Sequence, residues 1–202
     1  MYKLLFVLTL CSIAITLRAQ STANGKLKGH GYVDLGLSVK WATCNVGANS
    51  PSDYGDYFAW GEAKTKSTYT ESNSATYERA TYTFLDAASL NWGSAWRIPT
   101  KAECQELIDN CIWIWTTVGG HDGYKVTSKK NGNSIFLPAG GIRRGSEHNG
   151  TGEYGFCWTS QPHDIQSPYA SDGAYSLHFG SDVPVVDWCN RDRGISVRPV
   201  TE

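Results

Sequence analysis

The clearest pattern of apolar and polar positions lies in the segment AECQELIDNC, residues 102–111. Its two cysteines, its leucine and its isoleucine recur at helical spacing and form one apolar stripe. Thr100, followed three residues later by Glu103, makes a capping box, which is typical of a helix start. The pattern therefore predicts a helix over Lys101–Asn110 that packs on a sheet.

Elsewhere the pattern is typical of short strands. Two runs surround Gly36, and the runs YKVT and SIFLP flank Asn131-Gly132, a pair that favours a two-residue hairpin turn. A second, short helix is expected to end at Gly93. Four more strands are expected toward the C-terminus: Phe156–Ser160, Ala174–Gly180, Val185–Cys189 and Ile195–Val200.

Strands and helices that segregate along the chain in this way predict an α+β domain. We expect a twisted antiparallel sheet with two helices and long loops, and the first and last strands could pair. The polar stretch 64–81 and the glycine-rich stretch 141–155 are expected to be surface loops. The composition, with 21 Gly, 8 Trp and 11 Tyr, suits such a loop-rich domain better than a helical bundle.

Residues 1–19 are typical of a secretory signal peptide, because they combine a positive start, an apolar run and a small residue before the cut. The apolar run, Leu4–Thr16, is shorter than the ~20 residues that span a bilayer. A retained anchor and a lipoprotein acylated at Cys11 are weaker interpretations. Cleavage leaves a flexible leader, residues 20–30, and a single domain over residues 31–202. The expected location is the periplasm, the cell surface or the medium.

The charge of the mature chain bears on its partners. After loss of Lys3 and Arg18, 16 basic residues face 19 acidic ones, which gives a net charge of −3. Nucleic-acid binding is therefore not expected, because it calls for a basic excess. No second long apolar run follows, so the mature chain is expected to have no transmembrane segment.

The mature chain keeps five cysteines, and export permits disulfides. Cys104 and Cys111 lie on the predicted helix, ~10.5 Å apart along its axis and too far apart to bond each other. The preferred disulfide is Cys44–Cys111. Cys157 and Cys189 are a second pair if their strands are neighbours.

Signatures of catalysis are missing from the sequence. The nucleophile elbow, the P-loop, the HExxH helix and the dinucleotide-binding glycines are all absent. The five histidines are scattered without metal-ligand spacing. The sequence therefore predicts a protein that is not an enzyme, with no metal and no cofactor.

The late strands carry the candidate site. In one of them Tyr175 and Leu177 alternate with Ser176 and His178, which predicts one buried face and one wet face. Aromatic, arginine and polar side chains on a rigid base suit a recognition surface. The expected ligand-binding residues are Cys157, Thr159, Gln161, His163, Ser176, His178, Asp187, Trp188, Cys189, Arg191, Asp192 and Arg193.

Five blocks, YVDLGLSVKWATCNVGA, YGDYFAWGE, WRIPTKAE, NGNSIFLPAGG and GISVRPV, resemble the Fibrobacter succinogenes major paralogous domain family of gut Bacteroidetes, over nearly all of residues 31–202. That family is similar to the C-type lectin fold. The broader group includes target proteins of diversity-generating retroelements, in which a C-terminal segment ending much like SVRPV varies at surface positions. The resemblance implies a C-type-lectin-like fold and a variable ligand-binding face at the candidate site. Cys104 departs from the family, in which Trp is common, and Cys157 and Cys189 are also unexpected.

The resulting hypothesis is an exported binding domain for a protein or glycan on a cell, a phage or a host. Two alternatives stay open. One is a structural or tip subunit of a surface assembly. The other is an enzyme related to the formylglycine-generating group, which WRIPTKAE also resembles, although RGISVRP lacks that group's reactive cysteines. The calcium-dependent sugar motifs of true C-type lectins are missing as well.

Overall fold

The structure is a computed structural model that describes residues 23–78, 81–163 and 172–202. The expected signal peptide, residues 1–19, lies outside these ranges. Part of the expected flexible leader is strand, because Gly25–Leu27 pairs with His30–Val33. Within the described ranges, no helix has the length and apolar character needed to cross a membrane.

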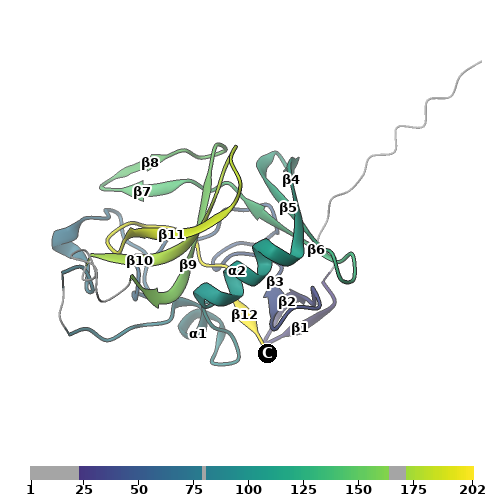
Figure 1. Ribbon diagram of the computed structural model, residues 1–202. Helices are drawn as coiled ribbons and strands as arrows, with labels where there is room; N and C mark the ends of the chain where they lie inside the picture. The colour runs from purple at the N-terminus through teal and green to yellow at the C-terminus, as the bar shows by residue number, and fades with distance from the viewer. Residues whose placement is uncertain (1–22, 79–80, 164–171) are drawn as a thin grey trace, which may run out of the picture.

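The described chain forms four antiparallel sheets and two α-helices, without a closed barrel (Figure 1). One sheet has the order β1-β2-β3-β12 and comprises Gly25–Leu27, His30–Val33, Lys40–Ala42 and Val200–Thr201. Another has the order β4-β5-β6 and comprises Cys111–Val118, His121–Ser128 and Ser134–Pro138. The other two are the β7–β8 hairpin, Ile142–Arg144 with Glu147–Asn149, and the sheet β11-β10-β9, Val185–Asn190, Gly173–Phe179 and Gly155–Pro162.

The α+β class is confirmed, whereas the expectation of one continuous sheet is wrong. The strands form four separate sheets, and between β3 and β4 the described residues contain helices, turns and isolated bridges but no sheet strand. The expected pairing of the first and last strands is wrong: β12 pairs with β3, where Val200 lies opposite Trp41, and β1 lies at the other edge of that sheet. Of the predicted strand Ile195–Val200, only its end is part of a sheet.

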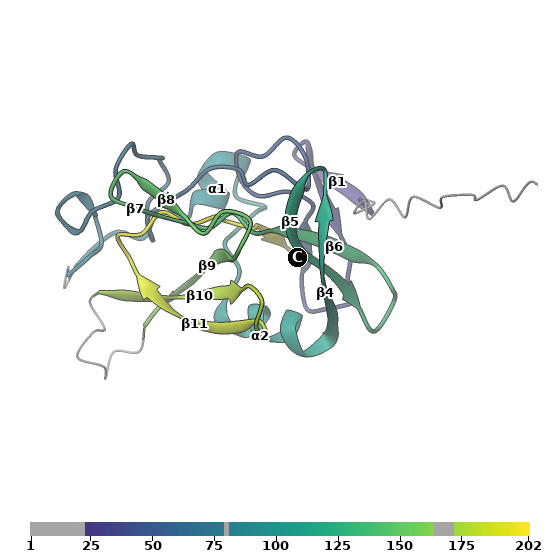
Figure 2. The same ribbon diagram turned by 90° about the horizontal axis from the view of Figure 1, so that it is seen from above.

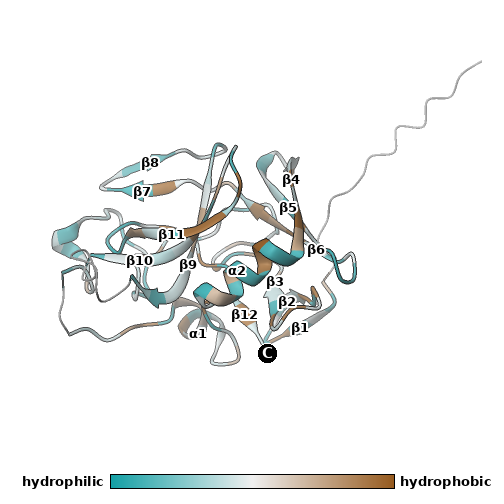
Figure 3. Ribbon diagram, viewed as in Figure 1, coloured by the Kyte–Doolittle hydropathy of each residue, from teal (hydrophilic) through white to brown (hydrophobic). Residues whose placement is uncertain are grey.

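The two helices are α1, Ala87–Trp92, which ends at Gly93 as predicted, and α2, Lys101–Asn110. The capping box of α2 is confirmed: Thr100 Oγ1 accepts a hydrogen bond from the Glu103 amide at 3.2 Å, and a Glu103 carboxylate oxygen accepts one from the Thr100 amide at 2.8 Å. Colouring by hydropathy shows apolar and polar residues alternating along α2 (Figure 3). Its buried side packs on β9, β10 and β11, and the β7–β8 hairpin lies beyond that sheet (Figures 1 and 2).

Three regions differ from the sequence interpretation: the β5–β6 turn, strand β4 and the β7–β8 hairpin. The chain turns between β5 and β6 through the longer loop 129–133, closed by a 2.8 Å bond from the Ser128 amide to the Asn133 carbonyl, so a two-residue Asn131-Gly132 turn is wrong. Strand β4 was not predicted, although Ile112 and Ile114 alternate with two tryptophans there. The stretch 141–155, expected to be a loop, contains the β7–β8 hairpin.

A buried arginine joins distant parts of the core. The Arg198 side chain is fully buried and donates hydrogen bonds to Asn45 Oδ1 at 2.8 Å and to the Phe136 carbonyl at 2.9 Å. It also donates to the carbonyls of Ala42 and Thr43, at 3.1 and 2.9 Å. This one side chain therefore ties the C-terminal segment to β6 and to the end of the N-terminal sheet.

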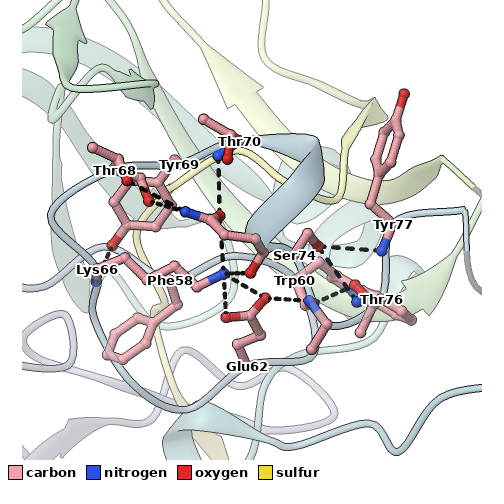
Figure 4. A network of polar contacts seen from close by, with 12 residues as sticks. Phe58, Trp60, Glu62, Lys66, Thr68, Tyr69, Thr70, Ser74, Thr76 and Tyr77 are labelled. Atoms are coloured by element: carbon pink, nitrogen blue, oxygen red, sulfur yellow. Dashed lines mark hydrogen bonds and ion pairs between the residues drawn. The ribbon is translucent and has the colours of Figure 1, made fainter.

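The polar stretch 64–81 was expected to be a surface loop, and its described residues form a loop that is held by hydrogen bonds. The Lys66 ammonium pairs with Glu62 and donates to the Asn73 carbonyl at 2.6 Å (Figure 4). The Thr76 hydroxyl donates to the Trp60 carbonyl at 2.8 Å. These bonds fix a compact loop beside the buried residues 58–60.

The disulfide prediction is wrong, because all five described cysteines are free thiols. Cys111 is buried in the core beneath α2, whereas Cys44 lies near the N-terminal strands, beside Thr43. Cys157 and Cys189 do not pair either. Their strands, β9 and β11, lie on either side of β10. Two strand spacings put β9 and β11 roughly 9–10 Å apart, which is farther than a disulfide can reach.

Candidate functional site

The β9–β10–β11 sheet, which carries most of the expected ligand-binding residues, is covered on both faces. On the α2 face, Leu107 and Leu177 belong to one buried cluster. On the other face, the Trp60 indole donates to the Thr159 carbonyl at 2.8 Å and the Trp158 indole donates to the Phe58 carbonyl at 2.7 Å. A sheet with one wholly wet face is therefore the wrong description of this region.

Three expected ligand-binding residues are buried as a result: Cys157, Thr159 and Ser176. The Thr159 hydroxyl donates to the Tyr175 carbonyl at 2.8 Å, and the Ser176 hydroxyl shares a 2.7 Å hydrogen bond with His178 Nε2. Their prediction as surface residues is wrong. Cys157 lies opposite Leu177 and is buried under α2, whereas Ser176 lies opposite Trp158, on the face covered by residues 58–60. Strand alternation alone reveals neither covering layer.

Arg191 and Asp192 are also buried, so their assignment to the binding face is wrong as well. The Arg191 guanidinium donates to the Gly173 carbonyl at 2.9 Å and lies over the Trp60 ring at 4.7 Å from its centroid. Arg193 donates to Asp192 at 2.9 Å, and burial raises the pKa of the Asp192 carboxyl. These side chains stabilise the base of the site.

The aromatic and polar residues left at the surface come together at one end of the sheet, beside the start of α2. The rings of His163 and Trp188 stack, with centroids 5.3 Å apart and planes 26° apart. The His163 ring also meets the edge of Tyr175 at 5.3 Å. The Lys101 ammonium lies 3.5 Å from the centroid of the Tyr175 ring, and Gln161 accepts a hydrogen bond from the Lys101 amide at 2.9 Å. We name this group, Lys101, Gln161, His163, Tyr175 and Trp188, the Trp188 surface.

Strand register explains why these rings share a face. Tyr175 lies directly opposite Trp188 in the β10–β11 pair, and directly paired residues project from the same side of a sheet. Gly173 leaves room for the stack, because a Cβ there would lie 3.0 Å from the Trp188 ring and 3.2 Å from His163 Cβ. Trp188 keeps 38% of its surface exposed.

Four expected residues lie away from the Trp188 surface. Asp187 and Cys189 alternate with Trp188 and so project from the opposite face of β11. His178 is on that face too, packed against Phe156 at 4.6 Å between ring centroids. Arg193 lines a polar cavity of about 640 Å³ beside η1, Glu71–Asn73. The twelve expected residues therefore do not form one patch: only Gln161, His163 and Trp188 belong to the Trp188 surface.

No family model, no curated protein and no solved structure matches this chain.

Two members of the Trp188 surface were missed by sequence reasoning. Tyr175 was expected to point inward, and it does lie on the α2 face, but α2 begins only beside it, at Lys101, and leaves it partly exposed. Lys101 was treated only as the first residue of the helix. The packing of α2 on β9, β10 and β11 brings the helix start to this end of the sheet, and that long-range contact has no local signal in the sequence.

Four of the cysteine thiols are expected to be unreactive at neutral pH. Burial raises the pKa of Cys157 and Cys111 to about 11 and that of Cys189 to about 12, and it also raises the pKa of Cys104. These thiols stay protonated at neutral pH, and a thiol reacts as its thiolate. Among the described residues there is also no group of three or more His, Cys, Asp or Glu side chains placed to hold a metal ion.

Proposed function

We propose that this protein is an exported ligand-recognition domain whose Trp188 surface binds a protein or a glycan on another cell, a phage or a host. The observation that carries the proposal is the stacked pair of His163 and Trp188, which lies next to the Lys101–Tyr175 contact. Both sit on a sheet whose strands β9 and β10 are packed on both faces. Such a surface offers contact area without the cost of ordering mobile side chains.

The chemistry of the Trp188 surface suits either class of ligand. Aromatic faces pack against the apolar face of a sugar ring or against apolar side chains of a protein. Lys101 and Gln161 add a cation and an amide at the same place. The resemblance to the C-type lectin fold supports the same proposal, because in that broader group the C-terminal segment displays variable positions on a stable scaffold.

The enzymatic alternative receives less support from the same geometry. A formylglycine-generating type of oxidase needs reactive cysteines, and four of the described thiols have a pKa raised by burial. Scaffold packing accounts for these cysteines directly, since Cys104 and Cys157 belong to the core cluster under α2.

The proposal is tested by probing an array of glycans and purified cell-surface proteins with labelled wild-type protein. The Trp188→Ala variant should lose the array signals of the wild type because it removes the largest exposed ring of the surface. Leu90→Ala is the matched control, since Leu90 is 61% exposed on α1, away from the site. A reproducible set of signals unchanged in Trp188→Ala would refute the role of this surface.

A second candidate function, a structural subunit of a surface assembly, is favoured by strand β4. In the described structure β4 forms an edge of its sheet, and its sequence CIWIWTTV contains no charge and no proline. Ile112 and Ile114 are 50% and 56% exposed on it. Edge strands are usually protected by charges, prolines or bulges, so an unprotected edge of eight residues suits pairing with another strand.

A further inference from the structure

A second concave site lies away from the Trp188 surface, where the turn between β10 and β11 approaches strand β4. It is a cavity of about 820 Å³, within the usual range of ligand pockets. Its walls come from two residues before β9, the start of β9, the end of β10, the following turn, the first residue of β11 and one side chain of β4. The lining residues that matter here are Trp115, Glu153, Tyr154, Phe156, His178 and Asp182.

The aromatic walls are held rigidly by one another. Tyr154 and Phe156 meet edge to face at 5.5 Å between centroids, and Phe156 meets His178 at 4.6 Å. On the opposite wall, Trp115 packs edge to face on Tyr124 at 5.1 Å and keeps 37% of its surface exposed. The cavity therefore has preformed apolar walls that still reach solvent.

The charge of this cavity has one sign. Glu153 and Asp182 line it, both are exposed, and no lysine or arginine is among the described residues around it. His178 adds no positive charge at neutral pH, because burial lowers its pKa to about 4. Two carboxylates beside aromatic rings complement a cation carried on an apolar stem, since cations are attracted to both.

We propose that this cavity binds a basic side chain, lysine or arginine, of a partner peptide. The aliphatic stem packs against Trp115 and Phe156, while the cationic head group lies near Glu153 and Asp182. This site is additional to the Trp188 surface, and its test does not depend on whether that surface binds anything.

The test is a titration of the protein with Nα-acetyl-lysine methylamide, followed by the NMR signal of the Trp115 indole N–H. The uncharged probe Nα-acetyl-norleucine methylamide has nearly the same shape. We expect the lysine probe to shift the Trp115 signal and to bind about tenfold more tightly than the norleucine probe, which corresponds to ~1.4 kcal/mol. The arginine probe should behave like the lysine probe.

Variants separate the contributions of charge and stem. The double variant Glu153→Gln/Asp182→Asn should remove the preference for lysine over norleucine, whereas Asp109→Asn, which removes a carboxylate from the exposed side of α2, should leave it intact. Equal binding of the two probes by the wild type would overturn the proposal, as would a preference that survives in the double variant. Tighter binding of free butylamine than of the lysine probe would overturn the assignment to a peptide.

Discussion

Trp188 and Arg191 lie three residues apart and have opposite roles. Trp188 is 38% exposed and stacks on His163, whereas Arg191 is 2% exposed and donates to backbone carbonyls that surround it. The sequence presents both as large polar or aromatic side chains in one short segment, so it cannot tell them apart. What decides is the loop 58–78, which covers Arg191 and not Trp188, and that long-range contact has no local signal.

The burial of His178 gives a prediction about pH at the same scale. Its pKa falls from 6.5 to about 4 in the folded protein, mainly because of burial, so between these values the unfolded chain binds more protons. The His178 contribution to stability is therefore full above pH 6.5 and is lost as the pH falls toward 4. The expected loss is roughly 3 kcal/mol.

The measurement is urea unfolding at several pH values for the wild type and for His178→Gln. The free energy of unfolding of the wild type should fall more steeply between pH 6.5 and pH 4 than that of the variant. Parallel curves for the two proteins would contradict the burial of a neutral imidazole at this position.

At the scale of elements, local signals were reliable where the sequence itself stabilises an element. The α2 boundaries and cap followed from Thr100, Glu103 and the apolar stripe, because a capping box closes within four residues. Strand β4 was not predicted, because its run of apolar and aromatic residues directly follows α2. Periodicity alone does not show where the helix ends and the strand begins. The β7–β8 hairpin was not predicted, because its strands are only three residues long and mostly polar.

The exposed edge of β4 gives the element-scale prediction. If β4 pairs with strands of other molecules, Ile114→Lys should block this pairing, because a charged side chain on an edge strand opposes the addition of another strand. Light scattering after size exclusion should show a mass that rises with concentration for the wild type and a monomer for Ile114→Lys. A wild-type monomer at every concentration would contradict the structural-subunit candidate.

For the whole molecule, the expected pairing of the first and last strands is wrong, because β12 pairs with β3 and β1 with β2. The α+β class could be predicted, since it depends on the order of elements along the chain. The division into four sheets and the burial of Cys157, Thr159 and Ser176 could not. Both depend on which segments pack against each sheet. Strand alternation contains no information about a covering segment such as residues 58–60, which lie about a hundred positions before β9 in the sequence.

Arg198 supports a prediction at this scale, because its guanidinium joins three separate segments. Arg198→Met keeps most of the side-chain volume but leaves four buried oxygen atoms without their donor. An unsatisfied buried acceptor costs about 1–3 kcal/mol, so the free energy of unfolding should fall by at least ~3 kcal/mol. Arg144→Met is the control, since Arg144 is exposed. Chemical denaturation measures the free energy of unfolding of both variants. Equal stability of the two would contradict the role of Arg198 in joining the three segments.

On the proposed function, recognition resides in the Trp188 surface and can be removed without loss of the fold. The most direct measurement is the dissociation constant of an array-identified ligand for wild type, Trp188→Ala and Leu90→Ala, each confirmed as folded by its melting curve. We expect Trp188→Ala to bind the ligand about tenfold more weakly than the wild type, which corresponds to ~1.4 kcal/mol. Leu90→Ala should have the same dissociation constant as the wild type. Unchanged affinity in a folded Trp188→Ala protein would contradict it.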